Sequence, residues 1–301
     1  MTTREIAVIG LGAVGFGIAS SILRAGFTVH GCDTRADVRE RFTALGGVAA
    51  STPAQAAKNA SLVIVVVVNA EQTEAVLFGE HGAVAAMSAG AVVMTCATVP
   101  PEFAQAIGER ITASGLLAID APTSGGPARA ATGELTLMSS GAPAAYAKIE
   151  DVLKVIAAKV YRLGDTAGIG SKVKMINQLL AGVHIAAACE AMALGIHAGV
   201  DPNMIYEVIS NSAGSSWMFQ NRVPHILAGD YTPLSAVNIF VKDLAIVADT
   251  ARKMPFPVPL TSLAHQMFLM AAAQGHGAAD DTSVIKVYQA LAGFKLPEQA
   301  P

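Results

Sequence analysis

Residues 5–26 read EIAVIGLGAVGFGIASSILRAG, and this stretch decides the fold. An apolar, β-branched run leads into the turn GLGAVG, and a helical pattern then continues to Gly26. In such a strand–turn–helix, glycines permit a tight turn and let the backbone approach a pyrophosphate, which lies at the helix N-terminus. We therefore predict a dinucleotide site whose cofactor-binding residues are Gly10, Leu11, Gly12, Ala13, Val14 and Gly15.

An acidic residue follows at the position where such a site needs one. The next predicted strand, TVHGCD at 28–33, ends on Asp33. A carboxylate about 20 residues beyond the glycine turn accepts hydrogen bonds from the ribose hydroxyls of the cofactor. It also repels a 2′-phosphate, so we expect NAD as the cofactor. Arg35 keeps NADP as the alternative.

The alternation of strands and helices continues through the first half of the chain. Residues 61–68, SLVIVVVV, form an apolar run without alternation, which is typical of a strand buried on both faces of a parallel sheet. The pattern predicts a doubly wound, parallel-sheet Rossmann domain in the α/β class. Its further strands are expected at 91–97, 115–122, 134–141 and 159–165, with a helix at 35–47.

The pattern changes after about residue 165, where β-branched strand runs stop. We predict an NAD-binding Rossmann domain over 1–165 and an all-helical domain for substrate binding and oligomerisation over 166–301. A long helix at about 169–198 joins them. The other helices are expected at 201–211, 216–227, 235–253, 258–274 and 281–292.

Composition excludes several classes of protein. The net charge of −3 shows no excess of basic residues, so we expect no nucleic-acid partner. No signal peptide and no membrane span is recognised, and we expect a cytoplasmic protein without a membrane partner. Cys32, Cys96 and Cys189 are far apart, which indicates buried thiols in a reducing compartment. Because the histidines form no HxxxH pair or Cys/His cluster, we predict no metal.

A second candidate site lies in the stretch DAPTSGGP at 120–127. Pro122 disfavours a helix, and Ser124, Gly125 and Gly126 expose consecutive N–H groups at the end of a strand. Such a segment forms either an anion-binding concavity or an ordinary strand-to-helix turn. On these residues alone both interpretations stay open.

Two lysines stand two positions apart in GIGSKVKMINQ at 168–178. On a helix, the face of Lys174 continues with Asn177 and Gln178, whereas the face of Lys172 is apolar. A Lys-Asn-Gln face is usually solvated. Because this helix continues with one charged residue over many positions, we expect it to be buried nearly all round. We predict that Lys174 is the functional lysine and that Lys172 holds its amine in water.

Four motifs together resemble the β-hydroxyacid dehydrogenase family, which includes 3-hydroxyisobutyrate dehydrogenase and tartronate semialdehyde reductase. They are the GLGAVG turn, residues 120–141, residues 168–178 and FVKDL at 240–244. The resemblance covers essentially the whole chain. Residues 177–194, 213–244 and 280–288 resemble the L-threonate dehydrogenase branch. Gln178 fits that branch, because many other members have a second Asn after Asn177.

The resemblance implies a role for each matching residue. Lys174 is the catalytic lysine, Asn177 holds the substrate beside it, and Ser124–Gly126 bind the substrate carboxylate. Thr98 contacts the nicotinamide half of the cofactor. The remaining two residues belong to FVKDL: Lys242 touches cofactor or substrate, and Asp243 supports that cluster.

These roles are consistent with the chemistry of alcohol oxidation. The nicotinamide takes a hydride, and a positioned base takes the hydroxyl proton. A free lysine has a pKa of about 10.4, so burial or a neighbouring cation must lower it. The resemblance implies oxidation of the C2 hydroxyl of L-threonate with Lys174 as general acid/base.

Two alternatives stay open at this point. One is another small hydroxy acid, 3-hydroxyisobutyrate or tartronate semialdehyde, as the substrate of the same class of enzyme. The other is a dinucleotide-binding interaction module without catalysis. The apolar helical domain also predicts association into a homodimer or homotetramer.

Overall fold

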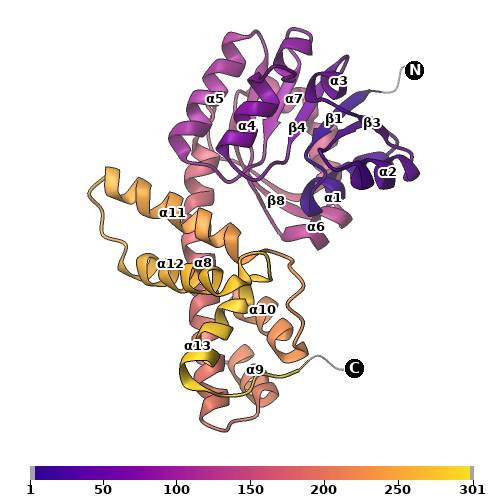
Figure 1. Cartoon of the computed structure of the whole chain (residues 1–301). Coiled ribbons are helices and arrows are strands. Elements are labelled where there is room, and N and C mark those ends of the chain that lie inside the picture. The colour runs from indigo at the N-terminus through magenta and orange to yellow at the C-terminus, as the bar shows by residue number, and fades with distance from the viewer. Residues whose placement is uncertain (1–3, 299–301) are drawn as a thin grey trace. The chain divides into compact units, whose positions relative to one another are not determined.

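The computed structural model describes residues 4–298 (Figure 1). The chain divides into two compact units, and the boundary in the sequence falls between Lys174 and Met175. This boundary lies inside a helix, whereas the sequence prediction placed it before that helix, at 165/166. Each unit is described by itself.

The first unit contains one sheet with strand order β3-β2-β1-β4-β5-β6-β8-β7, and β9 pairs with β8. All pairs from β3 to β6 are parallel, whereas β8 is antiparallel to β6. The predicted Rossmann class is confirmed, with an antiparallel strand added at one side, as is common in such sheets. The strands are β1 (Glu5–Ile9), β2 (Thr28–Cys32), β3 (Val48–Ala50), β4 (Leu62–Val65), β5 (Val92–Thr95), β6 (Leu117–Asp120), β7 (Thr123–Ser124), β8 (Leu135–Gly141) and β9 (Ala157–Arg162).

Helices cover both faces of this sheet. Figure 1 shows the sheet and the helices packed on it. Successive strand residues point to opposite faces, so Ile6 and Val8 pack with α1, α2, α6 and α7, while Ala7 and Ile9 pack with α3, α4 and α5. β4 is buried at every position, as its apolar sequence predicts. The helices are α1 (Ala13–Arg24), α2 (Ala36–Ala44), α3 (Pro53–Ala57), α4 (Ala70–Phe78), η1 (Val84–Ala86), α5 (Pro101–Ala113), α6 (Gly126–Thr132) and α7 (Pro143–Ile156).

The second unit is helical, as predicted, and its helices enclose a core of its own. The predicted helix at 258–274 departs from α-helical form after Ala271, because Gly275 has a φ of 89°. The predicted helix at 281–292 starts as a 3-10 turn. The elements are α8 (Ile169–His197), which begins in the first unit, α9 (Pro202–Ser210), α10 (Trp217–Ala228), α11 (Val237–Lys253), α12 (Pro259–Ala271), η2 (Ala272–His276), η3 (Asp281–Val284) and α13 (Ile285–Ala292).

The expectation that α8 is buried nearly all round is wrong. Ile176 and Leu180 are 55% and 50% exposed. An apolar sequence alone does not force every side chain of a helix into the core, since folded proteins also expose apolar residues. Within residues 4–298, α8 is the one helix long and apolar enough to cross a membrane. That criterion is weak, since core helices of folded proteins also meet it. Polar side chains of α8 are also hydrogen-bonded within the fold.

Candidate functional site

The carboxyl ends of five parallel strands coincide at one edge of the sheet. Ile9 pairs with Cys32 and with Val65, Val65 pairs with Thr95, and Thr95 pairs with Asp120. Each of these residues ends its strand. The segments that follow, including the glycine turn and the DAPTSGG stretch, therefore start at the same edge, where open α/β sheets bind ligands.

The three glycines of the turn have different physical roles. Gly10 has a φ of +92°, and an added Cβ would lie 2.2 Å from the Val66 carbonyl oxygen. At Gly15 an added Cβ would lie 1.9 Å from the Gly10 carbonyl oxygen, so α1 packs closely on the turn. At Gly12 an added Cβ meets nothing within 4 Å. The open position lies at the N-cap of α1, which is where a pyrophosphate must approach the backbone.

Asp33 is brought to this turn, as the sequence predicts. Its carboxylate accepts hydrogen bonds from the Leu11 N–H at 2.9 Å and from the Arg35 N–H at 3.0 Å. The Arg35 Nε also donates to it at 3.1 Å. Burial acts to raise the pKa of Asp33, but the Arg35 side-chain and backbone hydrogen bonds and the Leu11 N–H outweigh it and hold the pKa below its usual value. These hydrogen bonds favour the carboxylate form of Asp33 beside the glycine turn.

The Ser124–Gly125–Gly126 segment follows β6 at the same edge. Ser124 pairs with Thr136 in the short β7–β8 ladder, and Gly126 begins α6. Gly125 and Gly126 have φ values of +126° and +70°, a conformation that favours glycine. An added Cβ at Gly126 meets nothing within 4 Å, so its backbone is approachable. Two consecutive glycines with positive φ before a helix are compatible with an anion-binding concavity.

Thr98 lies between β5 and α5, three residues beyond the end of β5. It is half-buried and starts from the same edge of the sheet. The contact of Thr98 with the cofactor stays a prediction.

A further residue at this edge, Asp120, has a function that the sequence analysis missed. Asp120 is 2% exposed and accepts from the N–H groups of Gly168 at 3.0 Å and Ser171 at 2.8 Å, and from the Ser171 hydroxyl at 2.8 Å. Burial raises its pKa, against these hydrogen bonds. Asp120 thus caps the first turn of α8. Its position at the end of a strand, directly before Ala-Pro, was the available signal.

The two lysines of α8 differ as predicted. Lys174 is 7% exposed, whereas Lys172 is exposed. The side chain of Lys174 therefore does not extend into bulk solvent. Asn177 follows it by three residues, so both leave the same side of α8.

In the second unit, the structure brings Asn177 together with Lys242 and Asp243 through Gln178. Asn177 Nδ2 donates to Gln178 Oε1 at 2.9 Å, and Gln178 Nε2 donates to Asp243 Oδ2 at 2.5 Å. Lys242 Nζ forms an ion pair with Asp243 Oδ1 at 2.5 Å. We call Asn177, Gln178, Lys242 and Asp243 the α8–α11 polar network.

Residues 280–283 form a second buried polar cluster in this unit, and the sequence analysis gave them no role. All four are 0% exposed. Asp281 pairs with Arg222 Nε at 2.8 Å, and Asp280 pairs with His225 at 3.4 Å. Burial raises the pKa of Asp281 to about 6, and the Asp280 hydrogen bond raises the pKa of His225. These contacts hold α10 against η3.

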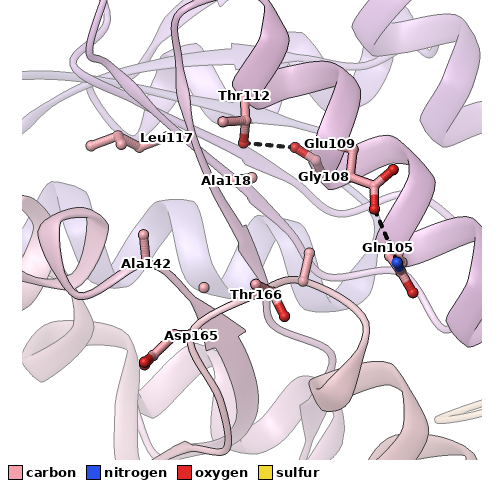
Figure 2. Close-up of a pocket in the computed structure, with 11 residues that line it drawn as sticks. Gln105, Gly108, Glu109, Thr112, Leu117, Ala118, Ala142, Asp165 and Thr166 are labelled. Carbon is pink, nitrogen blue, oxygen red and sulfur yellow. Dashed lines mark hydrogen bonds between the residues drawn. The ribbon is translucent and has the colours of Figure 1, made fainter.

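A pocket of about 430 Å³ opens in the first unit between α5 and the segment that precedes α8 (Figure 2). Thr112 donates to the Gly108 carbonyl and Gln105 donates to Glu109, so their polar groups are already paired (Figure 2). None of the predicted site residues lines it. In the described part of the chain no three His, Cys, Asp or Glu side chains gather as metal ligands.

Comparison with known families supports the two-part organisation. Residues 5–164 match the NAD-binding domain of 6-phosphogluconate dehydrogenase. Residues 168–288 match the family model described as NAD-binding of NADP-dependent 3-hydroxyisobutyrate dehydrogenase. Both matches describe proteins that bind a nicotinamide dinucleotide.

Individual relatives match over nearly their full length. L-threonate dehydrogenase of Cupriavidus necator is 61% identical, with 99% of each chain covered. 2-(Hydroxymethyl)glutarate dehydrogenase of Eubacterium barkeri is 32% identical, with 97% of each covered. A crystal structure of a Salmonella typhimurium protein named 3-hydroxyisobutyrate dehydrogenase has a TM-score of 0.90 at 46% identity, covering 94% of this chain and 99% of that one.

Proposed function

Because the chain belongs to the β-hydroxyacid dehydrogenase family and is an NAD-dependent enzyme, we propose that it oxidises the C2 hydroxyl of L-threonate to the ketone of 2-dehydro-L-erythronate. The observation that carries this substrate is the 61% identity to an L-threonate dehydrogenase over 99% of both chains. The alternative of a non-catalytic interaction module is dropped, since the chain is an enzyme.

The residues of the first unit fit the cofactor. The approachable backbone at Gly12 leaves space for the pyrophosphate, and Asp33 accepts from the ribose hydroxyls. Thr98 follows β5 at the same edge of the sheet and would contact the nicotinamide half. When bound, NAD accepts a hydride from the carbon that carries the hydroxyl.

The other site residues act on the acid substrate. Backbone N–H groups of Ser124–Gly126 bind the carboxylate of the substrate. Asn177 holds the substrate beside Lys174. The Lys174 amine takes the proton of the C2 hydroxyl in oxidation and returns it in reduction, a role typically worth about 10²–10⁴-fold in rate. Lys242 adds positive charge near the acid, and Asp243 holds Lys242 through their ion pair.

Initial rates of NADH formation test the substrate. We expect faster turnover with L-threonate than with 3-hydroxyisobutyrate or with glycerate, the reduced form of tartronate semialdehyde, at equal concentrations. 3-Hydroxyisobutyrate is the second candidate, because the Salmonella structure carries that name at 46% identity. A higher kcat/KM with 3-hydroxyisobutyrate would overturn the proposal in favour of that substrate.

The two lysines of α8 provide a matched pair for the mechanism. Lys174→Ala should abolish turnover while NAD still binds, since the glycine turn is untouched. Lys172→Ala removes an exposed amine from the same helix and should leave the rate near that of the wild type. Near-normal activity of a folded Lys174→Ala variant would contradict the catalytic role.

We also propose that the enzyme acts as a homodimer or homotetramer in the cytoplasm, without membrane association. Several large apolar side chains on the second unit are exposed, and their burial requires a partner surface. They include Ile176, Leu180, Leu194, Leu260, Leu263 and Leu291. All three cysteines are buried and free, as in a reducing compartment. Light scattering coupled to size exclusion tests the assembly.

A further inference from the structure

We propose that Gln178 fixes the orientation of the Asn177 amide, so that Asn177 presents its carbonyl oxygen to a substrate hydroxyl and selects polyhydroxylated acids. This inference rests on the proposed function and narrows its substrate class. It is carried by the α8–α11 polar network, in which Gln178 and Asp243 are 7% and 2% exposed.

The direction of each hydrogen bond in this network follows from its charged end. An ammonium group only donates and an ionised carboxylate only accepts. Lys242 Nζ lies 2.5 Å from one Asp243 oxygen, and the other Asp243 oxygen faces the Gln178 side chain. Gln178 must therefore direct its NH₂ group to Asp243.

The orientation of the Gln178 amide in turn determines the orientation of the Asn177 amide. With its NH₂ group on Asp243, Gln178 can offer only its carbonyl oxygen to Asn177. Asn177 must then donate through Nδ2, as the 2.9 Å contact shows. An asparagine held in this way leaves its own carbonyl oxygen outside the network. Because both Gln178 and Asp243 are buried, water cannot substitute freely for either partner.

A carbonyl oxygen that the network does not use has a definite preference among ligand groups. It accepts from an O–H and repels a carboxylate oxygen. Asn177 lies one helical turn beyond Lys174, which leaves it beside the group next to the reacting hydroxyl. In L-threonate that group is the C3 hydroxyl, whereas 3-hydroxyisobutyrate has no second hydroxyl. The network therefore favours an acid with hydroxyls on adjacent carbons.

Two Gln178 variants remove the constraint to different degrees. Gln178→Leu deletes both amide contacts. Gln178→Asn keeps an amide but is one methylene shorter, so it cannot span from Asn177 to Asp243, and it disturbs packing little. Lys172→Ala, on the exposed side of the same helix, is the control.

The measurement compares kcat/KM for L-threonate with that for 2,4-dihydroxybutanoate, which lacks only the C3 hydroxyl. For the wild type and Lys172→Ala we expect a preference of about tenfold for L-threonate, the usual effect of one unmade hydrogen bond in a desolvated site. In both Gln178 variants the preference should fall towards one, through loss of activity on L-threonate.

The outcomes separate this inference from the proposed function. A wild-type preference that persists in the Gln178 variants overturns the role of Gln178 alone. The absence of a wild-type preference overturns the hydroxyl contact of Asn177. If the wild type forms no NADH from L-threonate at all, the proposed function fails and this inference fails with it. Thermal melting of Gln178→Asn establishes that the compared proteins are folded.

Discussion

Asp120 accepts two hydrogen bonds from Ser171, one from its backbone N–H and one from its hydroxyl, each at 2.8 Å. Asp120 ends β6, and Ser171 lies in the first turn of α8, three residues before Lys174. A buried carboxylate thus fixes the helical turn that precedes the proposed catalytic lysine. Ser140 adds a hydrogen bond to the Gly170 N–H at 3.0 Å.

Replacing Asp120 should therefore impair catalysis more than cofactor binding. In Asp120→Ala the first turn of α8 loses three hydrogen bonds, and we expect kcat to fall by about 10- to 100-fold, as displacements near 1 Å do. The dissociation constant for NAD, measured by fluorescence titration, should stay unchanged because the glycine turn is separate.

Asp120→Asn is the matched control. Its carbonyl oxygen can accept from both backbone N–H groups, and its NH₂ group can donate to the Ser171 hydroxyl. This variant should retain most of the wild-type kcat. A folded Asp120→Ala protein with the kcat of the wild type would show that the cap does not position Lys174.

The glycine turn predicts opposite effects for two alanine substitutions. Gly12→Ala adds a methyl group in open space, so the free energy of unfolding should change by no more than about 1 kcal/mol. The same methyl group occupies the approach to the backbone, and the affinity for NAD should fall by about tenfold or more. Gly15→Ala drives a methyl group against the Gly10 carbonyl and should destabilise the fold by about 1–3 kcal/mol or more.

Denaturant unfolding and NAD titration on both variants distinguish these effects. Equal losses of stability in the two proteins would contradict the separate roles of the glycines. So would unchanged NAD affinity in Gly12→Ala.

Much of the local geometry of the candidate cofactor site could be predicted from the sequence because its determinants are local. The turn at 10–15 needs glycines for backbone reasons that do not depend on distant residues, and Asp33 follows at the end of the next strand. The choice between Lys172 and Lys174 used helical periodicity together with the expectation that α8 is buried nearly all round. Lys174 is buried although that wider expectation is wrong. In contrast, the direction of β8 is not encoded in its own composition.

The supporting contacts could not be predicted, because they join residues far apart in the chain. Asp120 and Ser171 are separated by 51 positions, and Gln178 and Asp243 by 65. Periodicity assigns a residue to a helix face but does not identify its partner. The sequence analysis placed Asp243 near the site through resemblance alone. It placed Gln178 on the helical face of Lys174 and noted its departure from the wider family, but it gave Gln178 no partner.

Substitution of Asp33 should change the preference of the enzyme between NAD and NADP, because Arg35 lies beside it. The Arg35 guanidinium donates to Asp33, and the Asp33 carboxylate excludes a 2′-phosphate. Asp33→Asn removes that negative charge and releases Arg35, which can then bind the phosphate. We expect the ratio of kcat/KM for NADP to that for NAD to rise by about 10- to 100-fold, the usual effect of a hydrogen bond to a charged group.

Arg35→Ala is the control for this change. It leaves the Asp33 carboxylate in place, so the preference for NAD should persist. The interpretation fails if Arg35→Ala shifts the preference towards NADP as strongly as Asp33→Asn does.

The buried Asp281 carboxyl group should make the stability of the second unit depend on pH. Burial raises the pKa of Asp281 from its ordinary 3.8 to about 6, although Arg222 opposes this. The folded state therefore holds the proton more tightly than the unfolded state. The stabilisation is fully present below pH 3.8 and is lost as pH rises through about 6. Since an asparagine side chain mimics the protonated acid at every pH, the Asp281→Asn variant should lack this dependence.

Urea unfolding of the wild type and Asp281→Asn at about pH 4.5 and about pH 7 measures the effect. The difference in unfolding free energy between the two proteins should change by about 2 kcal/mol over this interval, with the wild type losing stability at the higher pH. His225, whose pKa is raised mainly by its hydrogen bond to Asp280, adds a loss of the same sign in both proteins. Asp281 contributes a smaller part of the His225 shift, and that part enters the difference between the two proteins. A constant difference would mean that Asp281 titrates near its ordinary pKa despite its burial.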